Sequence, residues 1–139
     1  MVRVEVKGLR AELAEKGRRS LTPEDRTFVM LKDVEGKRAL DIEIGSAEAF
    51  AIGSALEGKR WDRPMTHELL WEVISALAAS LRQVTVSDYR GGMYFAQIEL
   101  TDGDGVPVVV SARPSDALAL ALRVDAPIFV NEALFADAA

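Results

Sequence analysis

VVVSARPSDALALALR, residues 108–123, is the stretch that decides the fold of this chain. Its three consecutive valines predict a strand that is buried on both faces. Pro114 ends this strand, because proline has no N–H for the ladder and restricts the residue before it. Ser115 is a suitable N-cap for the helix that follows, which has only two charged residues and should be buried nearly all round. Arg113 and Asp116 would then be charges held between two buried elements, where each needs a partner or a function.

The composition is that of a soluble globular protein with one domain. The chain has 139 residues, of which 49% are hydrophobic and 28% charged. It has no cysteine, which excludes disulfides and thiolate metal sites and fits a reducing compartment. The first residues alternate like a strand and do not resemble a signal peptide, and the apolar run at 69–81 is too short to span a bilayer. We therefore expect a cytoplasmic protein with no membrane segment.

The charge is unevenly distributed along the chain. The formal net charge is −5, which argues against strong non-specific binding to nucleic acid. Residues 1–38 hold ten basic and seven acidic side chains, a net charge of +3, whereas residues 39–139 hold seven and fifteen, a net charge of −8. The first quarter of the chain is therefore the more basic part.

The order of hydrophobic patterns and turn residues predicts an α+β fold. We expect a single domain over residues 1–139, with mostly antiparallel sheet or sheets of about six or seven strands and three or four helices packed outside. A polar stretch at 10–26 is an expected insertion or mobile loop, with at most a short helix at 10–16. The expected strands are 2–8, 27–32, 37–44, 82–89, 93–101, 106–111 and 127–130, and the expected helices are 46–56, 67–81, the helix after Pro114 and a C-terminal helix or tail at about 132–139.

Several details follow from local patterns. Ser46, Thr66 and Asn131 are placed to cap helices. The helix at 67–81 has Leu70, Ile74, Leu77 and Leu81 on one face, beside Trp71. The strand, turn and alanine-rich helix around Glu48 resemble those around Asp116, so a half-repeat is one interpretation. Asp102-Gly-Asp-Gly105 looks like the start of a calcium loop, but Arg113 stands where a bidentate glutamate is needed, which favours a hairpin turn.

Three ionisable residues could carry chemistry. Glu48 and Asp116 could together hold a divalent cation such as Mg²⁺, which could activate water against a phosphodiester. Alternatively, each carboxylate stabilises the start of its own helix, and one of them pairs with Arg113. His67 is the single histidine, which excludes multi-histidine zinc sites. It could equally be an exposed residue at the start of a helix with no special function.

The order of several short motifs resembles that of the bifunctional nuclease domain family. These motifs run over nearly the whole chain, from residue 2 to about 131. They are Ile44-Gly45, Glu48-Ala49, Ala51-Ile52, Leu56-Glu57-Gly58, Arg63-Pro64-x-Thr66-His67-Glu68-Leu69, Tyr94-Phe95-Ala96 and Ala112-Arg113-Pro114-Ser115-Asp116-Ala117. Glu68 stands where the family typically has aspartate, and Ser111 where aspartate is frequent.

The resemblance implies a nuclease that hydrolyses phosphodiester bonds of DNA, RNA or both, as a bacterial protein assisted by Mg²⁺ or Mn²⁺. It also implies roles for the polar residues that match the family's motifs. The catalytic residues would be Glu48, His67 and Asp116, with Glu48 and Asp116 as metal ligands and His67 as general acid or base; the substrate-binding residues would be Arg63, Arg113, Thr66 and Ser115.

A second hypothesis makes the chain a non-catalytic binding or regulatory module. In it the cluster of Arg113, Asp116, Glu48 and His67 is a structural polar network, and the alanine-rich helices form the interface of a homo-oligomer. The acidic pI of about 4.9 favours this hypothesis. Whether the cluster is sealed or opens to solvent distinguishes the two.

Overall fold

The computed structural model describes residues 1–14 and 25–137, in which seven strands form one sheet accompanied by four helices. The element order is the one that the sequence predicts, and the α+β prediction is confirmed. The elements are β1 (Val2–Glu12), β2 (Arg26–Asp33), β3 (Ala39–Ile44), α1 (Ser46–Leu56), α2 (Thr66–Ala76), β4 (Ser80–Arg90), β5 (Met93–Thr101), β6 (Pro107–Ala112), α3 (Pro114–Val124), β7 (Ile128–Val130) and α4 (Ala133–Asp137).

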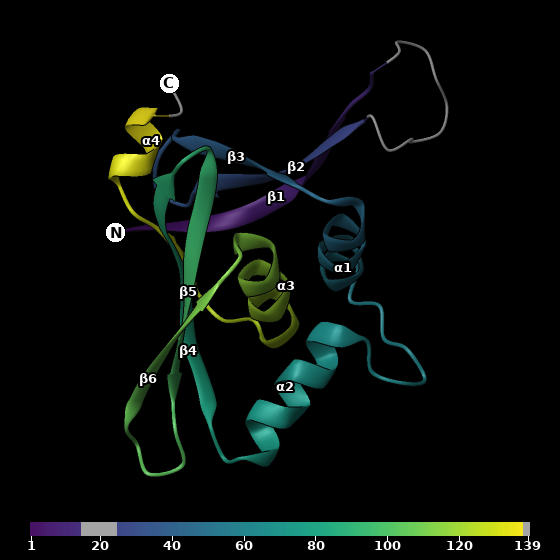
Figure 1. The fold of residues 1–139 in the computed structure, drawn as a ribbon, viewed down its shortest axis with the longest axis vertical. Coiled ribbons are helices and arrows are strands. Elements are labelled where there is room, and N and C mark those ends of the chain that lie inside the picture. Colours follow the sequence, from purple (N-terminus) through teal and green to yellow (C-terminus); the bar gives the residue numbers. More distant parts are fainter. Residues whose placement is uncertain (15–24, 138–139) are drawn as a thin grey trace.

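The sheet consists of two antiparallel meanders joined by a short strand. Its order is β3-β2-β1-β7-β4-β5-β6, and β7 pairs antiparallel with β1 and parallel with β4. Each meander is followed by a helix, α1 after β3 and α3 after β6, and these two helices pack against each other. Figure 1 shows α3 in the middle of the molecule, with α1 and α2 beside it. The topology therefore has the half-repeat that the sequence pattern suggested.

Helix α3 is the centre of the hydrophobic core. Seven of its residues are buried, from Pro114 to Ala121, as the near absence of charges predicts. Pro114 is the first helical residue, a position where its missing N–H costs nothing and its fixed φ suits the helix. The helix ends at Asp125, whose left-handed backbone (φ 57°) closes the last turn. Around α3 lie buried residues of both meanders, including Val29, Leu31 and Val84.

The predicted burial of the valine strand is wrong. Val108, Val109 and Val110 are 38%, 58% and 44% exposed, because β6 is an edge strand with a neighbour on one side only. In the antiparallel pairing Val110 lies opposite Ile98, and Val108 lies opposite Leu100. The apolar face of the sheet therefore continues beyond the part that α3 covers.

Helix α2 differs from its prediction in length and in burial. It ends at Ala76 rather than at residue 81, since Ala78 has a left-handed backbone (φ 62°) and β4 begins at Ser80. None of its residues is buried, its exposed apolar side chains include Leu70 and Val73, and Leu77 directly after it is also exposed. The predicted apolar face exists, but it faces solvent, with Ile74 and Trp71 partly covered.

Other predictions about segment ends were partly right. Strand β1 does not end at Gly8 but passes through it with a shift in register and reaches Glu12, so the predicted helix at 10–16 is wrong where β1 occupies it. Arg26 already belongs to β2, and residues 15–24 of the predicted loop lie outside the described residues. The hairpin turn at 102–105 is confirmed, because Oδ1 of Asp102 accepts hydrogen bonds from the backbone of Asp104 and Val106.

The N-caps also lie one or two residues earlier than predicted. Gly45, Met65 and Arg113 occupy the cap positions of α1, α2 and α3, and none of the three makes a side-chain capping hydrogen bond. Only Asn131 acts as predicted, accepting a hydrogen bond from the backbone of Ala133 at 3.1 Å. None of the helices in the described ranges is both long and apolar enough to cross a membrane.

Candidate functional site

The side chain of Arg113 connects two carboxylates from different halves of the chain. Its Nε donates to Oδ2 of Asp116 at 3.0 Å, and its Nη1 donates to Oε1 of Glu48 at 2.9 Å. A third bond, from Nη2 to Oδ1 of Asp116, is 3.3 Å long. This fork-like pairing is the geometry in which a guanidinium binds carboxylates most strongly. The predicted pairing of Arg113 with a carboxylate is therefore present, and it involves both.

Asp116 also contacts the single histidine. Nε2 of His67 lies 2.9 Å from Oδ1 of Asp116, and the imidazole is 13% exposed. Because the carboxylate partner is ionised and can only accept, Nε2 carries the hydrogen and donates a hydrogen bond to Oδ1. In the neutral ring, Nδ1 is then the acceptor. Asp116 thus fixes the orientation of the imidazole.

The cluster lies where the first turns of three helices meet. Glu48 is the third residue of α1, His67 the second of α2 and Asp116 the third of α3. The start of a helix carries partial positive charge from its free N–H groups, and here no cap side chain neutralises those groups. Three such starts within one cluster make a location that favours anions.

The charges of the cluster shift the pKa values of its members. Burial raises the pKa of Asp116, but hydrogen bonds from Arg113 and His67 and the nearby positive charge lower it more, so the net pKa is below its ordinary value. The pKa of Arg113 is raised by its hydrogen bonds to Asp116 and Glu48. Asp116 is therefore ionised and Arg113 charged at neutral pH.

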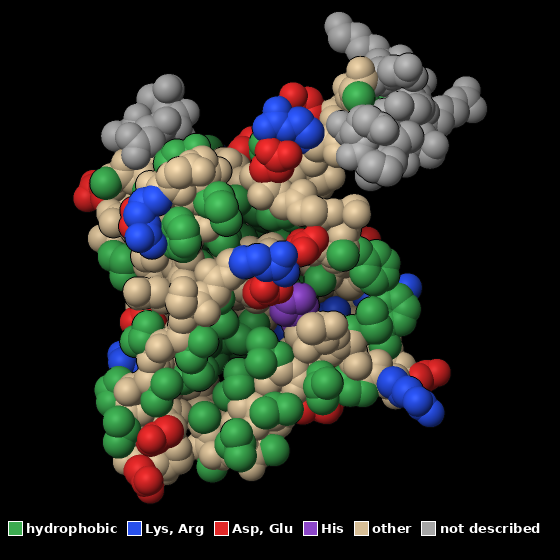
Figure 2. Space-filling model, viewed as in Figure 1, with side chains coloured by type: hydrophobic (Ala, Val, Ile, Leu, Met, Phe, Trp, Pro, Cys, Tyr) green, Lys and Arg blue, Asp and Glu red, His purple; other side chains and the backbone are tan. Residues whose placement is uncertain are grey.

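The cluster opens to solvent. Glu48, His67, Arg113 and Asp116 line a common cavity of about 360 Å³, whose other walls include Phe50, Trp61 and Met65. The side chain of Arg113 is 62% exposed and that of Asp116 33%. Figure 2 shows the histidine at the surface beside acidic and basic side chains, with hydrophobic side chains on both sides. The expectation that Arg113 is trapped between buried elements is wrong, because β6 has no neighbour beyond it.

The remaining predicted site residues are placed differently. Thr66 lines the cavity as the first residue of α2. Ser115 is buried and lines a second hollow that Glu48 and Arg113 share. Arg63 is exposed in the loop between α1 and α2 and lies outside the cavity lining. The structure thus assembles Glu48, His67, Arg113 and Asp116 and leaves Arg63 beside them.

A divalent cation does not fit the arrangement as it stands. Both predicted ligands, Glu48 and Asp116, are bound to the guanidinium of Arg113, which lies between them. Within residues 1–14 and 25–137, no group of three or more His, Cys, Asp or Glu side chains is arranged to hold a metal ion. An ion at this place would have to displace Arg113.

Two features near the cluster were missed from the sequence. Glu68 and Arg123 form a pair at 3.8 Å whose side chains are 12% and 10% exposed, at the base of the same cavity. Phe50 and Trp61 have ring centroids 5.9 Å apart on its wall. The signal for the second feature was present, because Trp61 stands among the cations Lys59, Arg60 and Arg63.

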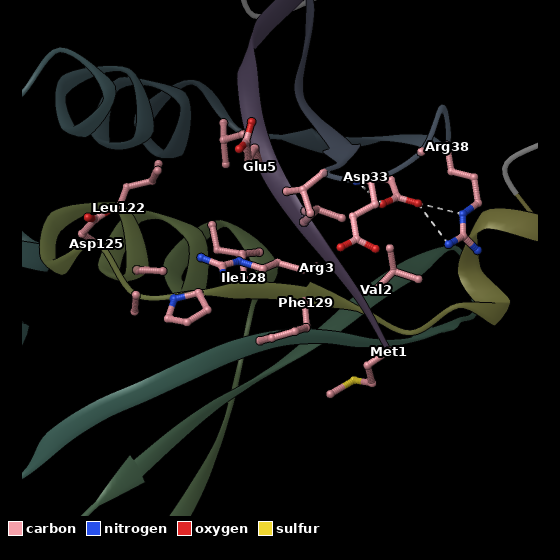
Figure 3. A pocket seen from close by; sticks show the side chains of 18 residues that line it. Met1, Val2, Arg3, Glu5, Asp33, Arg38, Leu122, Asp125, Ile128 and Phe129 are labelled. Atoms are coloured by element: carbon pink, nitrogen blue, oxygen red, sulfur yellow. Dashed lines mark hydrogen bonds and ion pairs between the residues drawn. The ribbon is translucent and has the colours of Figure 1, made fainter.

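A larger hollow lies elsewhere in the described part of the chain. It measures about 1020 Å³ and is lined by β1, the β2–β3 turn and the segment around β7 (Figure 3). Its buried carboxylate, Asp33, accepts hydrogen bonds from Arg38 and from the backbone of Glu35. These bonds hold the β2–β3 turn together, so Asp33 has a structural role there.

The lowered pKa of Asp116 predicts a contribution to stability that acid removes. The ionised carboxylate stabilises the folded state above the ordinary pKa of about 4, and this contribution is lost as the pH falls through the lower pKa of the folded state. Urea unfolding of the wild type and Asp116→Asn should show a difference in the free energy of unfolding that is smaller at pH 3 than at pH 7. Asp88→Asn, on β4, is the control. An equal difference at both pH values would contradict the prediction.

Comparison with known proteins places the chain in a family. Residues 29–139 match the model of the bifunctional nuclease domain. Two proteins of Mycobacterium tuberculosis, the uncharacterized protein MT1877 of strain CDC 1551 and the uncharacterized protein Rv1829 of strain H37Rv, are each 38% identical over 138 residues. The match covers 99% of this chain and 76% of either relative. The chain belongs to the bifunctional nuclease domain family.

Proposed function

We propose that this protein is a nuclease that hydrolyses phosphodiester bonds of DNA or RNA at the cluster of Arg113, Asp116, His67 and Glu48. One observation carries the proposal: an imidazole held by a carboxylate and an exposed guanidinium lie together in a cavity open to solvent. A sealed polar network would have supported a purely structural role. The membership in the bifunctional nuclease domain family agrees with the proposal.

Arg113 would bind the phosphate. Its guanidinium is held in place by Glu48 and Asp116 yet remains 62% exposed, so a phosphate oxygen can reach its outer edge. Two carboxylates beside one arginine repel an anion, and the starts of α1, α2 and α3 offset part of that repulsion. In this scheme Glu48 positions Arg113 and does not itself touch the substrate.

His67 would transfer the proton. Asp116 holds the Nε2–H, so Nδ1 accepts a proton from water as the water oxygen attacks phosphorus. The bond from phosphorus to the leaving ester oxygen breaks, and that oxygen, on the side of phosphorus opposite the attacking water, takes up a proton from solvent while Nδ1 releases its proton to solvent. The histidine returns to its neutral form and no other reactant is needed. Thr66, on the cavity wall, and Arg63, exposed in the loop before α2, would contact the flanking phosphates.

The sequence also suggested help from Mg²⁺ or Mn²⁺ bound by Glu48 and Asp116. The scheme above contains no step through a metal ion, since Arg113 binds both carboxylates. Activity measured with added Mg²⁺, with added Mn²⁺ and with a chelator tests this point directly. Full activity in chelator agrees with the scheme; a strict metal requirement would assign the two carboxylates to the ion instead.

Asp116→Asn should lower the cleavage rate by about 10²-fold or more, because the amide no longer orients and supports the imidazole. The measurement is the cleavage of fluorescently labelled single-stranded RNA and DNA oligonucleotides by purified protein. Asp88→Asn removes the same charge at a residue that does not line the cavity and should leave the rate unchanged. If Asp116→Asn and Asp88→Asn cleave equally fast, the observed activity comes from a contaminant or from another site.

A second candidate function is assembly with a second copy of this chain. We define the apolar face by exposed side chains on one side of the sheet and on the neighbouring helix: Val108 and Val110 on β6, Leu69, Leu70 and Val73 on α2, and Leu77 directly after α2. Figure 2 shows hydrophobic side chains gathered over the region of these two elements. Monomeric soluble proteins rarely expose contiguous apolar patches above a few hundred Å². Six large apolar side chains, between 37% and 73% exposed, make up this face.

The properties of β6 favour a second copy as the occupant. The strand Pro107–Ala112 has no charged residue, so two copies can approach each other without repulsion in a chain whose net charge is −5. It is an edge strand, and its free edge is able to pair with another strand. A symmetric dimer uses the same patch on both subunits, which suits a face that is apolar throughout.

Sedimentation velocity should therefore find a dimer at micromolar concentrations, and Val110→Glu, at a side chain that is 44% exposed, should convert it to a monomer. Val34→Glu is the matched control, because Val34 is 41% exposed in the β2–β3 turn, outside the apolar face. Circular dichroism establishes that both variants are folded. A wild-type protein that is monomeric at tens of micromolar would contradict the proposal.

A further inference from the structure

The loop at 57–65, between α1 and α2, contains three basic residues and Trp61, which lines the cavity of the cluster. The ring of Trp61 in this loop lies 5.9 Å from that of Phe50 on α1, at 36° between planes. Both rings line the cavity that contains His67 and Arg113. We call Phe50 and Trp61 the aromatic platform.

The aromatic platform is not explained by the core. Phe50 is 54% exposed, although the rest of α1 is dominated by small residues that pack closely. The Nε1 of Trp61 is buried and has no hydrogen-bond partner among the described residues. An unpaired buried donor is unfavourable and rare in stable proteins, so a residue that retains one usually has another use.

Three basic residues lie in the same loop as Trp61. The Nζ of Lys59 lies 4.2 Å from the centroid of the Trp61 ring, and Arg60 and Arg63 are exposed in the same loop. Residues 58–63 carry three cations and one acid, in a chain whose net charge is −5. This local excess of positive charge would attract phosphates. The cluster has no such excess, because the single charge of Arg113 does not offset its two carboxylate partners.

We infer that the aromatic platform binds an unpaired nucleobase, while the cations of the loop contact the adjoining phosphates. The inference rests on the proposed function and specifies its substrate as single-stranded nucleic acid. Aromatic side chains beside a positive surface are the usual means of binding single strands without sequence preference, since every base has a π-face. In a duplex these faces are already stacked and paired, so a duplex cannot use the aromatic platform. The exposed Phe50 offers the free ring, and Trp61 supports it.

Fluorescence titration tests the inference. In Trp71→Phe the chain has Trp61 as its single tryptophan. A single-stranded oligonucleotide should quench this fluorescence, whereas an abasic oligonucleotide of equal length and charge and a duplex of the same sequence should bind at least about tenfold more weakly. Phe50→Ala should weaken binding of the single strand by about tenfold. Leu56→Ala, an exposed apolar residue of the same helix that does not line the cavity, should leave it unchanged.

The outcomes separate this inference from the proposed nuclease. Equal affinity for the abasic and the complete oligonucleotide, equal affinity for the duplex, or no effect of Phe50→Ala would each overturn the base-binding inference, even if the protein cleaves nucleic acid. Base-dependent binding by a protein whose cleavage is insensitive to Asp116→Asn would retain the aromatic platform and reject the catalytic assignment.

Discussion

The guanidinium of Arg113 links the two halves of the chain at one point. It binds Asp116 at the start of α3 and Glu48 at the start of α1, and Asp116 in turn binds His67 at the start of α2. Without this cation, two carboxylates would face each other at a place where three helices begin. The position of the imidazole, the ionisation of Asp116 and the shape of the cavity all depend on it.

The distribution of charge reconciles an acidic protein with the anionic substrate that we propose. A net charge of −5 does not favour binding along a nucleic acid, and long-range attraction is not what the structure offers. Instead, the starts of three helices and Arg113 lie at one cavity, and the loop that contributes Trp61 to its wall has three cations at 58–63. Recognition would then depend on contacts at short range, with the aromatic platform contributing as much as the phosphates.

The sequence predicted the order of all helices and strands, because turn residues and periodicity are local signals. It also indicated the pairing of Arg113 with a carboxylate. It did not predict the exposure of Val108–Val110, because three valines favour a buried strand wherever the sheet continues, and only the strand order shows that β6 is an edge. The contact of Trp61 with Phe50 was not predicted for a similar reason. The two residues lie eleven positions apart in the chain, and tertiary packing sets the path of the loop between them.

The most direct test of the account follows the cluster itself by NMR. The side-chain nitrogen signals of Arg113 and His67 are to be observed while a short single-stranded oligonucleotide with non-hydrolysable phosphorothioate linkages is added. The account predicts that both signals shift together with the indole signal of Trp61, and that signals around Asp33, in the hollow beside β1, do not. Saturable shifts around Asp33 with none at Arg113 and His67, or no shifts at any concentration, would contradict it.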